Sequence, residues 1–312
     1  FEVGPATNCS DVSPAWPCDL HNTTSFINEL IDIESPDIVV HTGDIVDWAT
    51  HPSQLGMDDL YGVSVSNKKV WAASLGNHDG QSNLNRTQVL QYILSLNGTL
   101  TEMGPVGGPG GDGNFYLEVH RDNSPGSPVT FRTVHFDSDA NDESVTKDQV
   151  MWFQTLWKSF ADHTPALAFY HIPLSEYQEA INQSEPISGH MNEAISYQPT
   201  NSGLFQAMAD NGIVAGFCGH DHTNDFCVLH KGVQLCYEGS PGYQAYGKIG
   251  WNRRARVTEI SRWGGQVASW KRLDDGSIVD KETLFPAGDL SGRRSLEKEA
   301  TRGLPRRWQF QA

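Results

Sequence analysis

The sequence has no long apolar run and comparatively little positive charge. Its 312 residues contain nothing near the roughly 18 consecutive apolar residues that a membrane-spanning helix requires. Lys and Arg total 22 against 38 Asp and Glu, so the formal net charge is −16. Such an acidic surface argues against broad nucleic-acid binding, which needs a basic face to replace the counterions of the phosphates. We therefore expect a soluble globular protein without a membrane span or a nucleic-acid-binding surface, in which any anionic ligand is attracted locally.

Cysteine is also scarce, and its spacing fits no zinc motif of the CxxC type. The five cysteines are Cys9, Cys18, Cys218, Cys227 and Cys236. Cys9 and Cys18 could close a short loop. Cys227 and Cys236 flank two alternating runs that predict a hairpin, so these two could pair across it and leave Cys218 over.

The chain opens with Phe-Glu-Val-Gly-Pro, without an initiator methionine or a recognisable signal peptide. It nevertheless carries five N-x-S/T sequons, at Asn8, Asn22, Asn85, Asn97 and Asn182. Together with the possible disulfides, they favour a glycoprotein of the secretory pathway or the extracellular space. Unmodified surface turns are the alternative interpretation of the sequons.

Short apolar runs alternate with segments of helical period. The runs are rich in Val, Ile, Phe and Ala and predict strands buried on both faces, over residues 37–46, 70–75, 129–136, 166–171 and 213–218. Helices are predicted over 23–33, over 146–161 with a Thr-x-x-Gln capping box at its start, and over 202–210. This alternation predicts an α/β fold in one domain, 1–285. The remaining tail, 286–312, is charged and lacks an apolar period, so we expect a surface helix or disorder there.

Polar residues gather where these predicted strands end. The segments concerned are Gly-Asp-Ile-Val-Asp (43–47), Gly-Asn-His-Asp (76–79), His171 and Gly-His-Asp-His (219–222). Taken singly, each also fits a turn or a hydrogen-bonded core histidine. However, the carboxyl ends of strands in an α/β sheet line a common crevice, so four separate segments deliver Asp, Asn and His to one region. Oxygen ligands combined with imidazole suit ions such as Zn, Mn or Fe.

This ordered series resembles the calcineurin-like metallophosphoesterase superfamily over about residues 36–225. Flanking stretches, among them Phe-Cys-Gly-His-Asp-His-Thr-Asn-Asp-Phe-Cys (217–227) and Gly-Tyr-Gln-Ala-Tyr-Gly-Lys-Ile-Gly-Trp-Asn (242–252), resemble its single-domain purple-acid-phosphatase-like branch of plants and fungi. The resemblance extends to about Asp275. It implies a β-sandwich of two mixed sheets flanked by helices, in four layers αββα, and a site for two divalent or trivalent metal ions.

The resemblance also implies which residues bind the two metals. Asp44 would bridge both ions. Asn77, His171 and His220 would complete the second metal site, and His222 would bind the first.

Other residues of the same motifs would act without binding metal. By the same resemblance, His78 would approach the leaving-group oxygen as a general acid or stabilise the phosphoryl charge. Asp47 and Asp79 are candidates for orienting the imidazoles, which metal-binding histidines usually require. Asp47 occupies the position at which plant and mammalian purple acid phosphatases carry an iron-binding tyrosine. Arg253, Arg254 and Arg256 are either further phosphate contacts or ordinary strand and surface charges.

The superfamily has a further Asp-x-His on its first strand, which supplies two more ligands. Asp19-Leu20-His21 matches it literally but does not follow an apolar strand, because Pro-Ala-Trp-Pro-Cys precedes it and a helical segment follows. We assign this stretch to the entry of the first helix. The motif and its strand are instead expected upstream of Phe1.

The function implied is hydrolysis of a phosphate monoester by a water or hydroxide that the two metals activate. A phosphoprotein substrate follows only by analogy within the family. The alternatives are a phosphodiesterase acting on a nucleotide or lipid head group, and a secreted glycoprotein whose impaired site serves binding.

Overall fold

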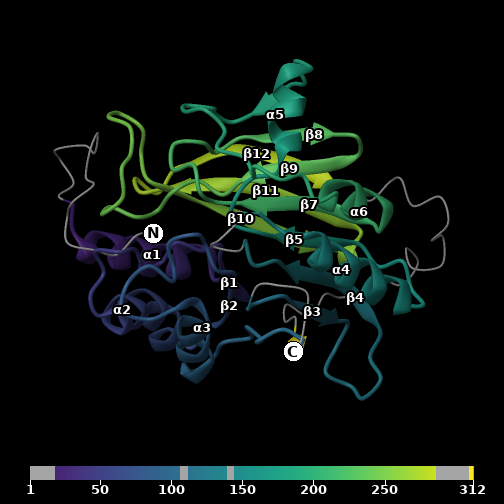
Figure 1. The fold of residues 1–312 in the computed structure, drawn as a ribbon, viewed down its shortest axis with the longest axis horizontal. Coiled ribbons are helices and arrows are strands. Elements are labelled where there is room, and N and C mark those ends of the chain that lie inside the picture. The colour runs from purple at the N-terminus through teal and green to yellow at the C-terminus, as the bar shows by residue number, and fades with distance from the viewer. Residues whose placement is uncertain (1–17, 106–111, 139–143, 286–308, 312) are drawn as a thin grey trace.

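The computed structural model describes residues 18–105, 112–138, 144–285 and 309–311. Its core is a mixed sheet of eight strands in the order β13-β3-β4-β5-β7-β9-β8-β6 (Figure 1). These strands are β3 (Phe115–His120), β4 (Val129–His135), β5 (Ala166–Phe169), β6 (Ile187–Ser188), β7 (Ile213–Cys218), β8 (Cys227–His230), β9 (Val233–Tyr237) and β13 (Gln309–Gln311). The central strands β4, β5, β7 and β9 run parallel, so their carboxyl ends lie at one edge.

Three helices cover one face of this sheet. They are α4 (Lys147–Ser159), α5 (Ser175–Asn182) and α6 (Leu204–Asp210). Phe153, Tyr177 and Phe205 from these helices are buried in one cluster with Phe136 and Leu235. This burial of apolar area fixes the helices on the sheet.

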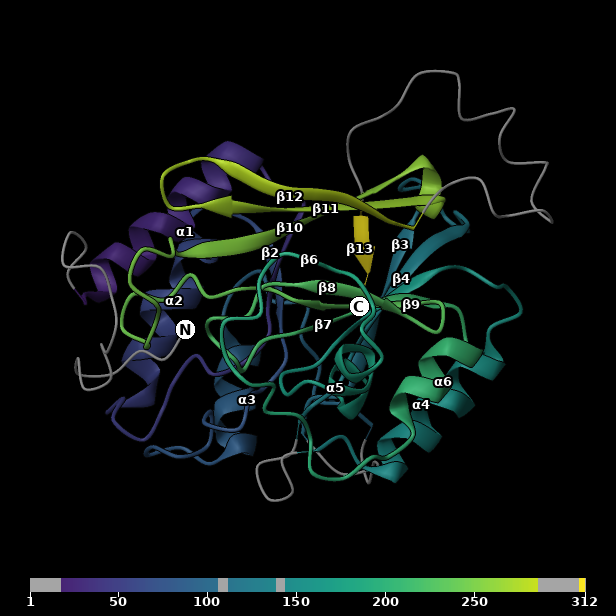
Figure 2. The same ribbon diagram turned by 90° about the horizontal axis from the view of Figure 1, so that it is seen from above.

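The opposite face packs against a second layer of strands. Figure 2 shows the antiparallel sheet β10 (Arg254–Ser261), β11 (Gln266–Leu273) and β12 (Ile278–Phe285) lying over β7, β8 and β9. The 3₁₀ turn η1 (Arg262–Gly264) joins β10 to β11. Phe131, Leu167 and Phe217 of the large sheet are buried with Val267 and Leu284 between the two layers.

The amino-terminal part adds a short parallel sheet and three more helices. The strands β1 (Ile38–His41) and β2 (Val70–Ala73) pair with each other, and α1 (Leu20–Glu34), α2 (Ser53–Ser66) and α3 (Arg86–Ser95) pack on them. The buried side chains include Ile27, Leu60, Trp71 and Leu90. Within the described residues, the layers therefore follow the expected order of helices, strands, strands and helices, with the second strand layer divided between β1–β2 and β10–β12.

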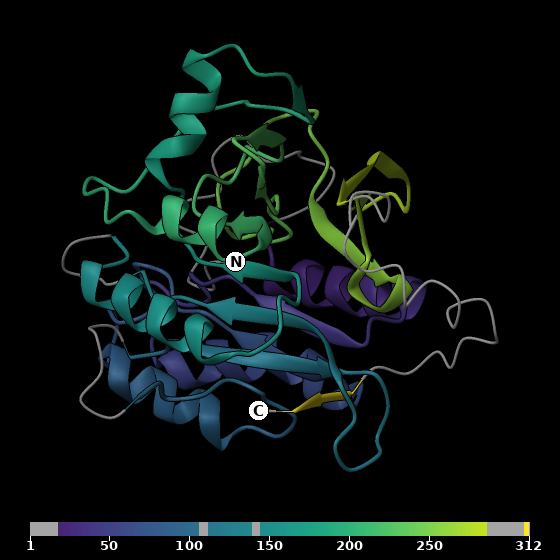
Figure 3. The ribbon, with the colours of Figure 1, turned by 90° about the vertical axis from the view of Figure 1, so that its right-hand side faces the viewer.

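The five predicted strand segments correspond to β1, β2, β4, β5 and β7, and the α/β class is confirmed. The predicted capping box of α4 is present, with Thr146 and Gln149 each bonded to the other's backbone. The predicted tail differs in part, because residues 309–311 form β13 rather than a helix or disorder. Figure 3 shows β13 beside the hairpin of β3 and β4, where extended backbone completes the edge of the sheet. The rest of that tail, 286–308, lies outside the described residues.

The cysteine predictions have separate outcomes. Cys227 and Cys236 form the expected disulfide across the β8–β9 pair, and Cys218 is a buried free thiol. Cys18 is disulfide-bonded as well, while Cys9 lies outside the described residues. No helix in the described part of the chain has the length and apolar character needed to cross a membrane.

Candidate metal centre

Asp44 lies just beyond β1, in a left-handed backbone conformation that residues other than glycine rarely adopt. Its φ is 52°, and Gly43 before it has φ 96°. The close packing explains the glycines on both sides, since a Cβ on Gly76 would overlap the Asp44 carboxylate and one on Gly43 would overlap Gly76. Left-handed backbone at a non-glycine residue costs free energy and is concentrated at functional sites.

His171 follows β5 and connects Asp44 to the end of β1. Its Nδ1 lies 2.7 Å from the Thr42 carbonyl oxygen, and its Nε2 lies 2.8 Å from Asp44 Oδ2. Burial would raise the pKa of Asp44, but the neighbouring His171 offsets this and holds that pKa below its usual value. Burial likewise opposes protonation of His171, yet Asp44 raises its pKa. The two side chains thus behave as a buried, mutually stabilised pair.

His220 completes a compact cluster with these two residues. Asp44, His171 and His220 each offer a ligand atom within 4.8 Å of the others. His220 also has a left-handed backbone, with φ 70°. Burial, followed by repulsion from His171, lowers the pKa of His220 to about 4, so its imidazole is neutral near pH 7 and has a lone pair for a metal.

The Gly-Asn-His-Asp segment lies against the same cluster. Asn77 is buried, and its Oδ1 has no hydrogen-bond partner within the described residues. His78 is half-buried; its backbone N–H donates to Asp44 Oδ1 at 2.8 Å, and its Nδ1 lies 2.7 Å from Gln81 Oε1. The segment is therefore held against Asp44 by the His78 backbone and by the close approach of Gly76.

Asp79 organises the backbone of the site rather than contacting an imidazole as we expected. Its Oδ2 accepts the N–H groups of Asp44 (2.8 Å) and Gly76 (2.7 Å), and its Oδ1 accepts those of Ile45 (2.9 Å) and Val46 (3.1 Å). One carboxylate thus fixes the two motif loops against each other. Sequence alone gives no signal for this role, because the acceptor lies more than 30 residues from three of its four donors.

Asp47 has a local role. Its Oδ1 accepts the N–H groups of Ala49 and Thr50 and the Thr50 hydroxyl, at 2.8–3.0 Å. These bonds close a turn after the Gly-Asp-Ile-Val-Asp segment. None of these three hydrogen bonds ends on an imidazole ring, so they do not show Asp47 orienting a histidine.

His222 is buried beside the cluster and has an aromatic partner that the sequence did not predict. Its ring stacks on that of Tyr246, with centroids 4.1 Å apart and planes inclined by 15°. The Tyr246 hydroxyl also donates to Glu193 Oε2 at 2.8 Å. Burial lowers the pKa of His222 well below its usual value, which keeps the imidazole neutral.

A cavity of about 200 Å³ adjoins these residues. Its lining combines the polar side chains with apolar residues of β1, β5 and β10, namely Thr42, Asp44, His171, His220, His222, Glu238, Val40, Leu167 and Ile260. Asp19 and His21 are not among the lining residues; the Asp19 carboxylate caps α1 by accepting the His21 N–H, as the assignment to the helix entry predicts. The strand expected upstream of Phe1 stays a prediction.

The donor set fits a metal ion. The cluster offers a carboxylate held ionised and imidazoles, and the adjoining Gly-Asn-His-Asp segment carries a buried amide oxygen that has no partner within the described residues. A buried acceptor left without a donor costs roughly 1–3 kcal/mol, and a bound cation would offset that cost. Mixed oxygen and imidazole donors of this kind are typical of Zn, Mn and Fe sites.

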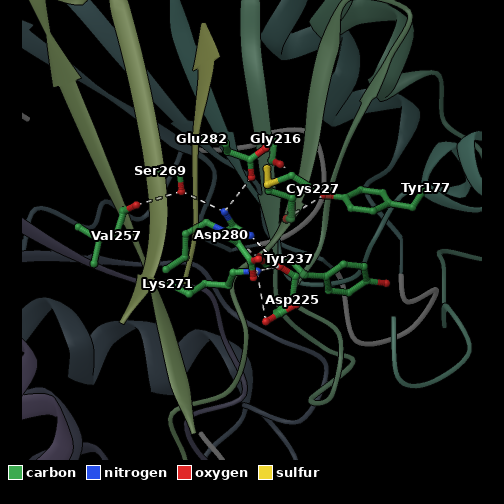
Figure 4. Close-up of a disulfide and its surroundings, with 12 residues drawn as sticks. Tyr177, Gly216, Asp225, Cys227, Tyr237, Val257, Ser269, Lys271, Asp280 and Glu282 are labelled. Atoms are coloured by element: carbon green, nitrogen blue, oxygen red, sulfur yellow. Dashed lines mark hydrogen bonds and ion pairs between the residues drawn. A yellow bond between two sulfur atoms is a disulfide. The ribbon is translucent and has the colours of Figure 1, made fainter. Parts of the chain in front are cut away.

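A second acidic group is occupied by side-chain cations instead. His190, Asp225 and Asp280 also lie within 4.8 Å of one another. Lys271 is fully buried between the two carboxylates, 3.3 Å from Asp225 and 2.5 Å from Asp280 (Figure 4). Arg254 lies 2.8 Å from Asp225. These ion pairs tie β11 to the loop after Gly-His-Asp-His.

The three arginines of the β10 region serve the same structural purpose. Arg253 donates to the carbonyls of Ala245 and Tyr246, and Arg256 donates to the Tyr237 carbonyl. Together with the Arg254–Asp225 pair, these bonds engage all three guanidinium groups with other groups of the protein. Arg254 and Arg256 are thus charges of strand β10, one of the two interpretations given above, and a phosphate contact by these arginines stays a prediction.

A family model for calcineurin-like phosphoesterases matches residues 5–224, which include every motif residue described above. The chain belongs to the calcineurin-like phosphoesterase family. It is 34% identical over 91% of its length to a protein of Arabidopsis thaliana named probable inactive purple acid phosphatase 14, of which the alignment covers 81%. It is 28% identical over 84% of its length to phosphatase DCR2 of Saccharomyces cerevisiae, covering 50% of that protein.

The fold of this family member is also similar to a solved structure. A dimetal phosphatase from Danio rerio superposes with a TM-score of 0.58, over 85% of this chain and 88% of that one, at 13% identity. At this identity, the likeness concerns the fold. It agrees with the mixed sheet and flanking helices of the present structure.

Proposed function

We propose that this chain is a metal-dependent phosphatase that hydrolyses phosphate monoesters. The observation that carries the proposal is the convergence of Asp44, His171 and His220 within 4.8 Å, beside the buried, unpartnered Oδ1 of Asn77. The chain is a member of a phosphoesterase family, and Asp44, His171 and His220 line a cavity large enough for a small ligand. Membership in the family alone would be weaker support, since function depends on the site.

In this proposal, Asp44 would be a ligand of both metal ions. Asn77, His171 and His220 would hold one of them, and His222 would hold the other. The ions, of the Zn, Mn or Fe type, would supply an activated water and positive charge for the phosphoryl oxygens. The chain's own residues prepare this by keeping Asp44 ionised and His220 and His222 neutral. The positive field of the two metal ions would also explain how a protein of net charge −16 attracts an anionic ester.

His78 is the proposed proton donor to the leaving group. Its backbone is fixed to Asp44, and Gln81 engages Nδ1, so proton transfer to the ester oxygen would use Nε2. A positioned general acid typically contributes a factor of about 10²–10⁴ to the rate. Removing the imidazole should therefore lower turnover while leaving the metal bound.

The test measures bound metal and turnover in the same preparations. Wild-type chain reconstituted with zinc, manganese or iron should hydrolyse an aryl phosphate, and His78→Ala should lose about 10²-fold or more in kcat. His163→Ala, a change at an exposed histidine after α4, is the matched control and should retain wild-type turnover. Equal turnover of wild type and His78→Ala would contradict the assignment of His78.

The second candidate is a glycoprotein that binds phosphate esters without turnover. The name of the Arabidopsis relative, which calls that protein probably inactive, favours it. Wild-type chain that binds metal and phosphate but turns over neither an aryl phosphate nor a bis-aryl phosphate would support this candidate. Faster turnover of the bis-aryl ester would instead indicate a phosphodiesterase.

The setting we propose is the secretory pathway or the extracellular space. The Cys227–Cys236 disulfide supports an oxidising compartment. The sequon asparagines Asn97 and Asn182 are exposed, at the ends of helices, where an oligosaccharide would meet no steric obstacle from the core.

A further inference from the structure

Thr42 and Glu238 lie outside the motif segments, and a hydrogen bond between them reaches the loop that bears Asp44. Thr42 follows β1, and Glu238 follows β9, in a different sheet. The Thr42 hydroxyl donates to Glu238 Oε2 at 2.6 Å. This hydrogen bond joins residues 196 positions apart in the sequence and links the ends of two strands that do not pair with each other.

The backbone of Thr42 in turn sets the orientation of His171. The Thr42 carbonyl can only accept a hydrogen bond, so the proton of the 2.7 Å contact resides on His171 Nδ1. The opposite nitrogen, Nε2, then faces Asp44 Oδ2 at 2.8 Å and is the atom available to a metal. Metal-binding histidines are commonly held in this way by a hydrogen bond to the nitrogen that does not bind metal.

The direction of that carbonyl needs an anchor. β1 ends at His41, and Gly43, the residue after Thr42, has φ 96°. A glycine flanking the peptide gives it more rotational freedom than another residue would. The bond from the Thr42 hydroxyl to Glu238 gives Thr42 a second anchor besides the contact of its carbonyl with His171.

Glu238 lies in the wall of the same cavity as the cluster residues. Burial raises the pKa of its carboxyl group to about 7, and its hydrogen bond to Thr42 acts in the opposite direction. Its hydrogen bond to Thr42 gives it a role in the site.

We propose that Thr42 and Glu238 form a positioning pair that holds the His171 imidazole with Nε2 directed at the metal. The inference rests on the proposed function, because it assumes that His171 binds a metal. Neither residue touches the substrate in this account. They act through the peptide of Thr42 and the ring of His171.

Isosteric substitutions test the pair with zinc as the probe. Thr42→Val removes the hydroxyl at nearly constant shape, and Glu238→Leu removes the acceptor. Both should weaken zinc binding, measured by calorimetry on the full chain, by about 10–100-fold. Thr42→Ser and Glu238→Gln keep a donor and an acceptor and should stay within about threefold of wild type.

Thr258→Val is the matched control, because Thr258 lines the same cavity from β10 and makes no hydrogen bond to the cluster residues. It should bind zinc with wild-type affinity. A second measurement follows the ring itself, by NMR of zinc-loaded protein labelled with ¹⁵N-histidine. The His171 Nδ1–H signal should persist in wild type and Thr42→Ser, and should exchange faster with solvent in Thr42→Val.

The outcomes separate this inference from the proposed function. Wild-type chain that binds no zinc, or His171→Ala that binds it as tightly as wild type, overturns the proposed function. Wild-type binding that depends on His171, together with unchanged affinity and an unchanged Nδ1–H signal in Thr42→Val and Glu238→Leu, overturns the positioning pair alone. If those two variants do not fold, a loss of affinity in Thr42→Ser or Glu238→Gln still contradicts the inference.

Discussion

Replacing Asp79 by asparagine should destabilise the protein far more than the conservative change suggests. The Asp79 carboxylate accepts four buried backbone N–H groups, two on each oxygen, at 2.7–3.1 Å. Asn has one carbonyl oxygen and an amide that only donates. In either orientation, Asp79→Asn therefore leaves two backbone N–H groups facing another donor.

The magnitude follows from those two bonds. A hydrogen bond to a charged group contributes roughly 1.5–3 kcal/mol, so losing two of them gives about 3–6 kcal/mol. Local relaxation of the loops would keep the loss near the lower end. That loss is still a large part of the roughly 5–15 kcal/mol by which a typical domain is stable.

Denaturant unfolding in metal-free buffer measures this loss without interference from ligand binding. Asp47→Asn is the matched control, because the three bonds of Asp47 all end on one oxygen, which asparagine retains. It should cost less than about 1 kcal/mol. An Asp79→Asn chain within about 0.5 kcal/mol of wild type would refute the role given to this carboxylate.

Two further predictions concern stability against acid and the cellular setting. Burial lowers the pKa of His135 to about 3, so between pH 6.5 and 3 only the unfolded chain takes up this proton; stability should fall with pH by about 1.4 kcal/mol per unit from this group. By pH 5 the loss reaches about 2 kcal/mol. The free energy of unfolding, measured by urea unfolding at several pH values, should lose this part of its pH dependence in His135→Phe; an unchanged pH dependence would contradict the assignment. Expression through a eukaryotic secretory pathway should give glycans at Asn97 and Asn182, seen as a mass decrease after enzymatic deglycosylation. Asn97→Gln should remove one of them, and a chain of unmodified mass would contradict secretion with glycosylation.

The parts of the fold that depend on local patterns were predictable from the sequence. The Thr-x-x-Gln pattern marked the start of α4 correctly, because a capping box involves residues only three apart. The alternating runs around His230 and Lys231 predicted the hairpin with its disulfide for the same reason. The helix α2 was not predicted, since its apolar residues are spread around the helix with no clear face.

The candidate site was predictable only up to its motif residues. Strand ends with Asp and His identified Asp44, His171 and His220, which the fold does bring together. The residues that support them, such as Glu238 and Tyr246, escaped notice because their partners lie far away in the sequence. Their roles depend on how the sheets pack, and no local pattern encodes that.

The central claim is that a metal ion binds among Asp44, Asn77, His171 and His220. Anomalous diffraction from crystals soaked in zinc, collected on either side of the zinc absorption edge, tests it most directly. A peak within coordination distance of those four side chains, absent from crystals of His171→Ala, is the predicted result. Zinc bound only elsewhere on the protein, with no peak at this cluster, would contradict the account.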